Sequence, residues 1–203
     1  RALREDRFTY SPPEPSFAVA LAKVYVSRGR WGKWLLGLVG LALAGIRQGA
    51  LAEGRRDLEI AASLDPGNSL IRSYLGKAYF EEKRGPLDVT QFDVAKQLDP
   101  NDPTPYLYDA IRLQAENRPV EALDQVEASI ERNDNRAVYR SRLLLDQDRA
   151  ARGVSLATVF TDLNFAEAGQ QAAAKSLVDN PADASAHRFL ADSYKDVRRR
   201  EIA

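Results

Sequence analysis

Two stretches of the sequence, LEIAASLDPGNS at residues 58–69 and FDVAKQLDPNDP at residues 92–103, contain the same Leu-Asp-Pro triplet. In each stretch an apolar residue stands eight positions before the proline and an alanine stands five positions before it. Proline beside Asp, Asn or Gly is typical of the end of one helix and the start of the next. The spacing of the two prolines, Pro66 and Pro100, therefore predicts a helical unit with a period of about 34 residues.

The rest of the chain has the same character. Apolar residues recur at helical spacing, whereas the alternating runs that are typical of strands are scarce. Clusters of Pro, Gly, Asn and Asp separate these runs at residues 65–68, 85–86, 99–103, 133–135 and 180–183. Helices of about 12–15 residues with short connections are typical of helical hairpins. The sequence therefore predicts an all-α protein made of antiparallel helical hairpins.

The period and the positions within it resemble the tetratricopeptide repeat (TPR) family, whose unit of about 34 residues ends its second helix before such a proline. Leu41-Ala42 and Leu75-Gly76 match the small-residue pair of the first helix, and Tyr79 matches its late aromatic residue. Gly49 matches the glycine between the two helices. The resemblance covers roughly residues 35–194. It implies a right-handed superhelical solenoid of four to five repeats with one inserted helical segment.

This repeat pattern divides the chain into four parts. Residues 1–34 are expected to form an irregular segment and one helix, at 16–29, and residues 35–134 to form three repeats. The next closing proline, Pro181, follows Asp134 by clearly more than one period, so we place an insertion at residues 135–149. Residues 150–203 then hold a fourth repeat and part of a fifth.

The insertion and its surroundings carry two further expectations. Its arginines Arg136, Arg140 and Arg142 are not balanced by acidic residues until Asp146, which leaves open an anionic partner or internal ion pairs. Residues 133–194 also resemble the TPR region of large bacterial envelope proteins that end in an outer-membrane part. That resemblance implies a bacterial periplasmic or outer-membrane-associated location in preference to the cytoplasm.

The stretch RWGKWLLGLVGLALAGIRQGALAE at residues 30–53 resembles an export signal or a membrane span. A signal peptide should begin the chain, and a span needs about 20 apolar residues, more than this run offers. The repeat register favours a buried repeat helix instead. The helix contains Gly37, Gly40 and Gly45, and we hypothesise that a further backbone, from the N-terminal segment or another protein, packs closely against them. The alternative is simple packing of this helix between residues 16–29 and the second helix of its own unit.

Composition excludes several kinds of chemistry. The chain has 29 basic and 29 acidic residues, whereas nucleic-acid binders usually carry a basic excess. Without cysteine there are no disulfides, thiolate metal sites or cysteine nucleophiles. His187 is the single histidine, and no phosphate loop, dinucleotide motif or zinc-protease motif occurs. We therefore expect no enzymatic activity, no cofactor, no metal and no nucleic-acid partner.

The TPR resemblance implies a non-enzymatic scaffold whose concave groove, lined by the first helices, binds a peptide, a helix or a partner subunit. The partner is another protein or a neighbouring part of a longer chain, within a larger bacterial assembly. Carried over by register, the predicted partner-binding residues are Tyr74, Lys77, Phe80, Glu81, Leu107, Tyr108, Ile111, Gln114, Thr158 and Arg188, with Thr161 and Asp192 beside them. The alternative is a membrane-associated accessory subunit anchored by residues 33–47.

Overall fold

The computed structural model describes residues 31–138 and 142–195, and the predicted helix at residues 16–29 lies outside them. These described residues are almost entirely helical and contain no strand. The elements are α2 (Trp31–Arg47), α3 (Leu51–Leu64), α4 (Ser69–Glu81), α5 (Gly85–Leu98), α6 (Pro103–Ala115), α7 (Pro119–Glu131), the 3-10 helix η1 (Asn133–Val138), α8 (Arg142–Asp162), α9 (Ala166–Asp179) and α10 (Ala184–Lys195).

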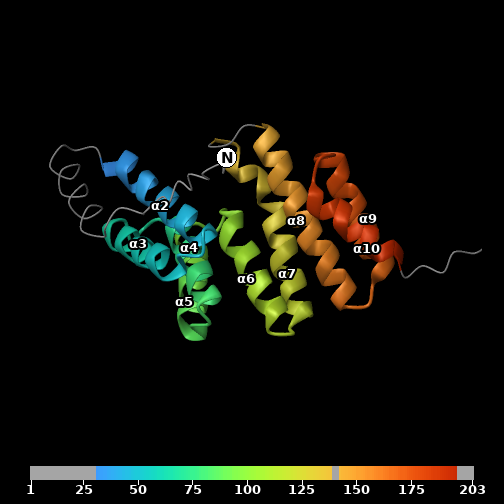
Figure 1. The fold of residues 1–203 in the computed structure, drawn as a ribbon, viewed down its shortest axis with the longest axis horizontal. Coiled ribbons are helices and arrows are strands. Elements are labelled where there is room, and N and C mark those ends of the chain that lie inside the picture. Colours follow the sequence, from blue (N-terminus) through green and yellow to red (C-terminus); the bar gives the residue numbers. More distant parts are fainter. Residues whose placement is uncertain (1–30, 139–141, 196–203) are drawn as a thin grey trace, which may run out of the picture.

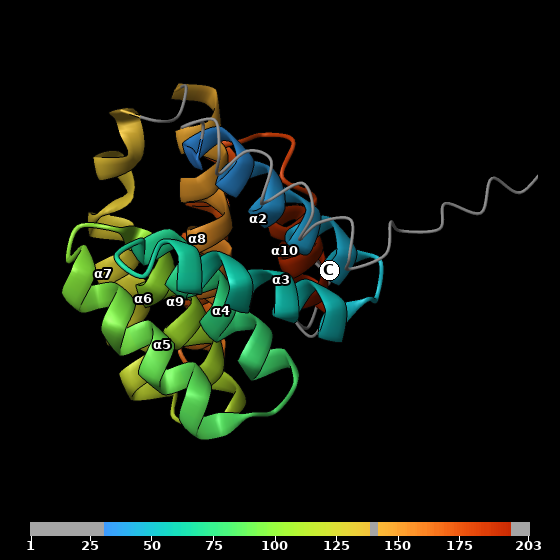
Figure 2. The same ribbon diagram turned by 90° about the vertical axis from the view of Figure 1, so that its left-hand side faces the viewer.

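Consecutive helices pair into antiparallel hairpins, α2 with α3, α4 with α5, α6 with α7 and α8 with α9, and α10 packs on the last pair. The hairpins stack side by side into an elongated array (Figure 1). Figure 2 looks along this array from the α2 end. The first helices also contact one another from hairpin to hairpin, α4 against α6 and α6 against α8. The structure confirms the predicted all-α solenoid of helical hairpins.

The repeat signature of the sequence marks the centre of each hairpin. Leu58 and Phe92, eight positions before the two prolines, are both 0% exposed. So are Ala61 and Ala95, five positions before the prolines. Full burial of a side chain such as Leu58 contributes roughly 1.5–3 kcal/mol. The residues that reveal the period are therefore the ones that hold each second helix against its first.

Residues of the predicted turns begin several helices. The side chain of Asn68 accepts a hydrogen bond from the backbone N–H of Ile71 at 3.2 Å, which caps α4. Asp102 accepts from Thr104 at 2.9 Å at the start of α6. Such caps satisfy N–H groups that have no partner inside the helix.

The turn within each hairpin contains one residue with a left-handed backbone. These residues are Gly49, Lys83, Asn117 and Asn164, with φ angles of 93°, 57°, 60° and 65°. The first three follow one another at intervals of one period, and the last comes after the longer interval that also separates the last two repeat ends. Glycine and asparagine tolerate this conformation better than lysine does.

The insertion is mostly continuous with the fourth hairpin. Residues 133–138 form η1, and residues 142–149 lie within α8, which at 21 residues is the longest described helix. Buried Arg152 of α8 fixes this arrangement, because its Nε donates to Ser129 Oγ at 2.9 Å and its Nη1 to Asn133 Oδ1 at 2.5 Å. The extra residues therefore lengthen a repeat helix and add a short 3-10 helix, and Arg152 of α8 joins both α7 and η1.

The glycines of α2 do not pack closely within the described part of the chain. A Cβ atom added to Gly37 or Gly40 would meet no atom within 4 Å, and one added to Gly45 would reach only Ala50 Cβ at 4.0 Å. Close packing occurs at Gly54 instead, where a Cβ atom would lie 2.5 Å from the backbone oxygen of Ala42. The hypothesised backbone against the α2 glycines stays a prediction.

No described helix, α2 included, combines the length and the apolar character that are needed to cross a membrane.

Candidate functional site

Two tyrosines from adjacent first helices form the centre of the candidate site. Tyr74 of α4 and Tyr108 of α6 are separated by one period of the repeat, and their ring centroids lie 6.1 Å apart with the planes inclined at 50°. The ammonium group of Lys77 lies 5.6 Å from the centroid of the Tyr108 ring, within the range of a cation–π contact. Lys77 also pairs with Glu81 at 2.9 Å. The structure thus brings four of the predicted partner-binding residues together.

The groups around Tyr108 shift the pKa of its phenol. Burial raises the pKa of the Tyr108 phenol above its usual range, and the nearby Tyr74 adds to this increase. The positive charges of Arg136 and Arg152 act in the opposite direction on that pKa. Because the phenol stays protonated at neutral pH, it can donate a hydrogen bond to a carbonyl or carboxylate.

Arg136, from the predicted insertion, extends this site. It belongs to η1 and its Nη1 donates to Thr104 Oγ1 at 3.0 Å, and its charge acts on Tyr108. Of the other insertion arginines, Arg142 is exposed and Arg140 lies outside the described residues. The sequence showed Arg136 only as unbalanced charge, and its proximity to Tyr108 was not predictable from the repeat register.

The remaining predicted residues of α4 and α6 lie on the same two helices as the tyrosines. Phe80 and Leu107 are half-buried, and Ile111 is 36% exposed. The amide of Gln114 donates to Asp162 Oδ2 of α8 at 2.6 Å, which joins two neighbouring hairpins. We use the term first-helix surface for eight residues, namely Tyr74, Lys77, Phe80, Glu81, Leu107, Tyr108, Ile111 and Gln114.

The predicted residues farther along the chain belong to later helices. Thr158 and Thr161 of α8 each donate to a backbone oxygen four positions earlier in the same helix, at 3.0 Å. Arg188 and Asp192 lie exposed on α10. Nothing in the described structure joins Arg188 to the tyrosine pair, since the contacts of α10 are with α8 and α9.

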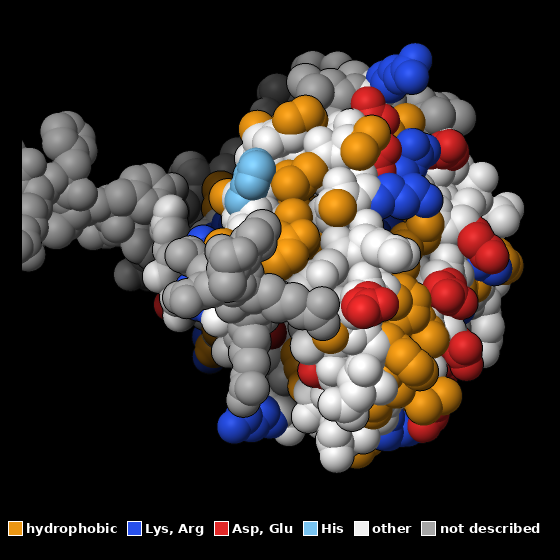
Figure 3. Space-filling view, turned by 90° about the vertical axis from the view of Figure 1, so that its right-hand side faces the viewer, with side chains coloured by type: hydrophobic (Ala, Val, Ile, Leu, Met, Phe, Trp, Pro, Cys, Tyr) orange, Lys and Arg blue, Asp and Glu red, His pale blue; other side chains and the backbone are white. Residues whose placement is uncertain are grey.

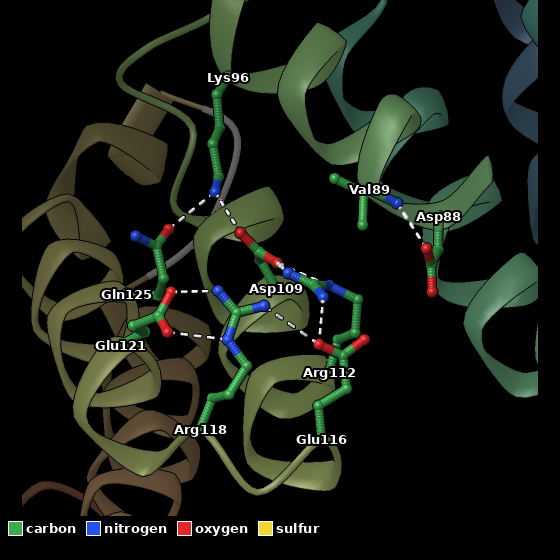
Figure 4. Close-up of polar contacts among 9 residues, drawn as sticks. All are labelled: Asp88, Val89, Lys96, Asp109, Arg112, Glu116, Arg118, Glu121 and Gln125. Carbon is green, nitrogen blue, oxygen red and sulfur yellow. Dashed lines mark hydrogen bonds and ion pairs between the residues drawn. The ribbon is translucent and has the colours of Figure 1, made fainter. Parts of the chain in front are cut away.

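A buried charge network connects α6 to its neighbouring helices (Figure 4). Asp109 and Arg112 are only 7% and 6% exposed, and Arg112 Nε donates to Asp109 Oδ1 at 2.9 Å. Lys96 of α5 contacts Asp109 Oδ2 at 2.5 Å and Gln125 of α7 at 2.7 Å. These charges therefore link α5, α6 and α7.

Sequence reasoning did not detect such internal charges. Arg55 of α3 is one such charge, since it is 8% exposed and pairs with Glu59 at 2.6 Å and with Glu82 at 2.8 Å. Charged residues alternating in sign look the same in sequence whether they face water or pair between helices. We regard both networks as structural, because their charged groups pair with one another within and between helices.

The C-terminal end of the array shows apolar and charged side chains interspersed (Figure 3). Exposed apolar residues here include Phe165 (59%), Val178 (81%) and Tyr194 (58%). His187 Nε2 lies 2.9 Å from the carbonyl oxygen of Pro181, a local contact at the start of α10. Among the described residues no cluster of His, Asp or Glu is arranged to hold a metal ion.

The solved structures that resemble this chain identify the fold. Pseudomonas aeruginosa PilF superposes with a TM-score of 0.66 at 17% identity, over 79% of this chain and 68% of PilF. PilW, a type IV pilus biogenesis factor, gives 0.64 at 16% identity over 79% of this chain and 69% of PilW. This chain has a TPR-like fold. The Cut9–Hcn1 hetero-tetramer gives 0.68 at 17% identity, over 89% of this chain but only 35% of the other.

Comparison of the sequence itself matches one part of this chain to a protein family. A family of unknown function, DUF6384, matches residues 1–63, which is less than half of the chain. No curated protein matches the sequence. At these identities the solved structures establish the fold of this chain and nothing about what it binds.

Proposed function

We propose that this chain is a non-enzymatic scaffold that binds a peptide, a helix or a partner subunit through the first-helix surface and the ends of its TPR-like solenoid. The proposal rests on the arrangement of Tyr74, Tyr108 and Lys77, which places two aromatic rings and a cation on adjacent first helices. Tyrosine is enriched among the residues that contribute most to protein–protein binding.

The chemistry of the surface fits a protein ligand. Tyr74 and Ile111 offer apolar contact, and the protonated Tyr108 phenol and Lys77 offer donors for carbonyl or carboxylate groups. Anchors of this kind rimmed by charge suit an amphipathic helix or an extended peptide. The same surface carries no carboxylate pair or nucleophile with a base beside it, so its features support binding in preference to catalysis.

We further infer that the chain acts within a larger bacterial assembly. PilW is a pilus biogenesis factor, and another structure of similar fold, with a TM-score of 0.53, is a type III secretion complex from Aeromonas hydrophila. Solenoids of this kind present extended surfaces on which several subunits can gather. A periplasmic or outer-membrane-associated location would suit such a role.

Site-specific photocrosslinking in native cells tests the proposal. A photoreactive residue at Ile111, on the first-helix surface, should crosslink to a discrete partner. The matched control is Val120, which is 64% exposed on the second helix α7. Crosslinks to a partner from Val120 but none from Ile111 would place binding on the other side of the solenoid and contradict the proposal.

A further inference from the structure

One face of α2 is apolar and exposed within the described part of the chain. It consists of Gly37, Leu41 and Ala44, and Leu41 is 57% exposed. These residues follow each other at helical spacing of four and three, so they share one side of the helix. A neighbouring side, with Leu38 and Ala42, is buried against α3.

The corresponding residues in the next repeat indicate which element packs on the exposed face. One period later, its three residues correspond to Ile71, Leu75 and Ala78 of α4, which are 3%, 3% and 1% exposed. Those three belong to the same apolar cluster as Leu58 and Ala62 of α3, the second helix of the preceding hairpin. In α4, therefore, the corresponding face is where the preceding hairpin docks.

The next hairpin repeats this arrangement. Two periods after the α2 face, the corresponding residues of α6 are Pro105, Asp109 and Arg112, and all three are buried. Lys96 of α5, again the preceding second helix, contacts Asp109. Only the α2 face lacks such a neighbour among the described residues. The register thus indicates a second helix missing from the start of the array.

We propose that the missing element is the segment of this same chain at residues 17–26, FAVALAKVYV, docked on the α2 face. Subtracting one period from the bounds of α3 gives residues 17–30. Because α2 begins at Trp31, residues 27–30 (SRGR) then form the connection. Ten helical residues span about 15 Å, enough to cover the roughly 10 Å between Gly37 and Ala44.

Two observations select this occupant over another protein. The segment joins the chain directly to α2, so its effective concentration at the α2 face is high. In addition, the match to the family of unknown function spans residues 1–63, so it includes this segment together with α2 and nearly all of α3. This match indicates that the segment and the first hairpin occur together, and the docked segment would cover Gly37, Leu41 and Ala44.

Thiol labelling of the 203-residue chain tests the proposal, because the chain has no cysteine of its own. In Leu41→Cys, the single thiol should react with a maleimide at least about tenfold more slowly than the thiol of Val178→Cys, whose position is 81% exposed. Adding Leu21→Asp and Val24→Asp should bring the two rates within about twofold, since two carboxylates oppose docking of the segment. Adding Lys23→Asp instead should leave the protection intact.

The other occupants give different results. Equal reactivity of the two thiols in the unmodified background would overturn the proposal. So would protection that disappears on dilution, which indicates a second copy, or protection that requires phospholipid vesicles, which indicates a membrane surface. Protection unchanged by the paired aspartates, with helix content retained by circular dichroism, would also overturn it.

Discussion

Tyr74 and Tyr108 occupy the same position in successive repeats, and their rings lie 6.1 Å apart across the boundary between two hairpins. One period earlier the position is Gly40, and in the fourth hairpin, after the longer interval that contains the insertion, it is Ser155. The aromatic pair is thus confined to the middle of the array. The middle of the array therefore differs from the other hairpins at this position. Lys77 and Arg136 both lie near Tyr108 of this pair.

The tyrosine pair should couple the stability of its two hairpins. A double-mutant cycle with Tyr74→Leu and Tyr108→Leu is expected to give a coupling free energy of about 0.5–1.5 kcal/mol, because tilted aromatic pairs contribute this much beyond burial. Urea unfolding of the four proteins measures it. Additive effects of the two substitutions would show that the rings do not interact in solution.

Lys83 should be a weak point of the second hairpin turn. Its φ of 57° is costly for a side chain with a Cβ atom, so Lys83→Gly should raise the free energy of unfolding by about 0.5–1 kcal/mol. The matched control is Lys175→Gly within α9, where glycine should lower it by about 1 kcal/mol. Thermal and urea denaturation report both changes. A loss of stability in Lys83→Gly would contradict the assigned backbone conformation.

The glycines of the first hairpin should respond in opposite directions to alanine. Gly54→Ala would bring a Cβ atom to 2.5 Å from the Ala42 oxygen and 2.6 Å from Ile46 Cγ1, so we expect a loss of about 1–3 kcal/mol. Gly40→Ala meets nothing within 4 Å in the described structure and should gain up to about 1 kcal/mol. Chemical denaturation compares them. The same loss in both variants would mean that another element packs against Gly40.

Asp88 should make the protein less stable as pH rises. This carboxyl is 2% exposed, and burial raises its pKa above the ordinary value of 3.8, while the N–H of Val89 and the charge of Arg112 partly oppose the increase. A raised folded-state pKa means that the stabilising contribution is complete below pH 3.8 and is lost as pH rises through the folded-state pKa.

The pH effect can be measured with Asp88→Asn. Relative to the unmodified chain, this variant should gain stability at about pH 7, and the gain should shrink as pH falls toward about 4. Asp93→Asn, at an exposed position of the same helix, is the control. Urea unfolding at a series of pH values gives the two profiles. A variant that is less stable at neutral pH would indicate that the ionised Asp88 is held by a favourable partner.

Much of the fold follows from local sequence. Helix ends were predictable at Pro66 and Pro100, because proline and its polar neighbours act on the backbone within a few residues. The buried Leu58 and Phe92 were recognisable because a repeat places the same residue type at the same depth in each unit. Both signals reflect interactions within a single hairpin, and the repeat makes them visible by showing them twice.

Features that depend on pairing between hairpins were not predictable. Buried Arg112 and Arg152 look in sequence like the exposed arginines of any helix, and only the position of Asp109 or Asn133 in space distinguishes them. The insertion was recognisable by its length, but the sequence did not show that residues 142–149 would lengthen α8. At the candidate site the register supplied the tyrosines, and the proximity of Arg136 required the structure.

The most direct test of the central claim is the affinity of a purified partner, once crosslinking identifies it, for two single variants. Ile111→Glu places a charge on the first-helix surface at a position that is 36% exposed, and Val120→Glu does the same on the second helix α7 at 64%. The account predicts at least about tenfold weaker binding for Ile111→Glu and unchanged binding for Val120→Glu. Unchanged affinity in Ile111→Glu, with its fold intact by circular dichroism, would contradict it.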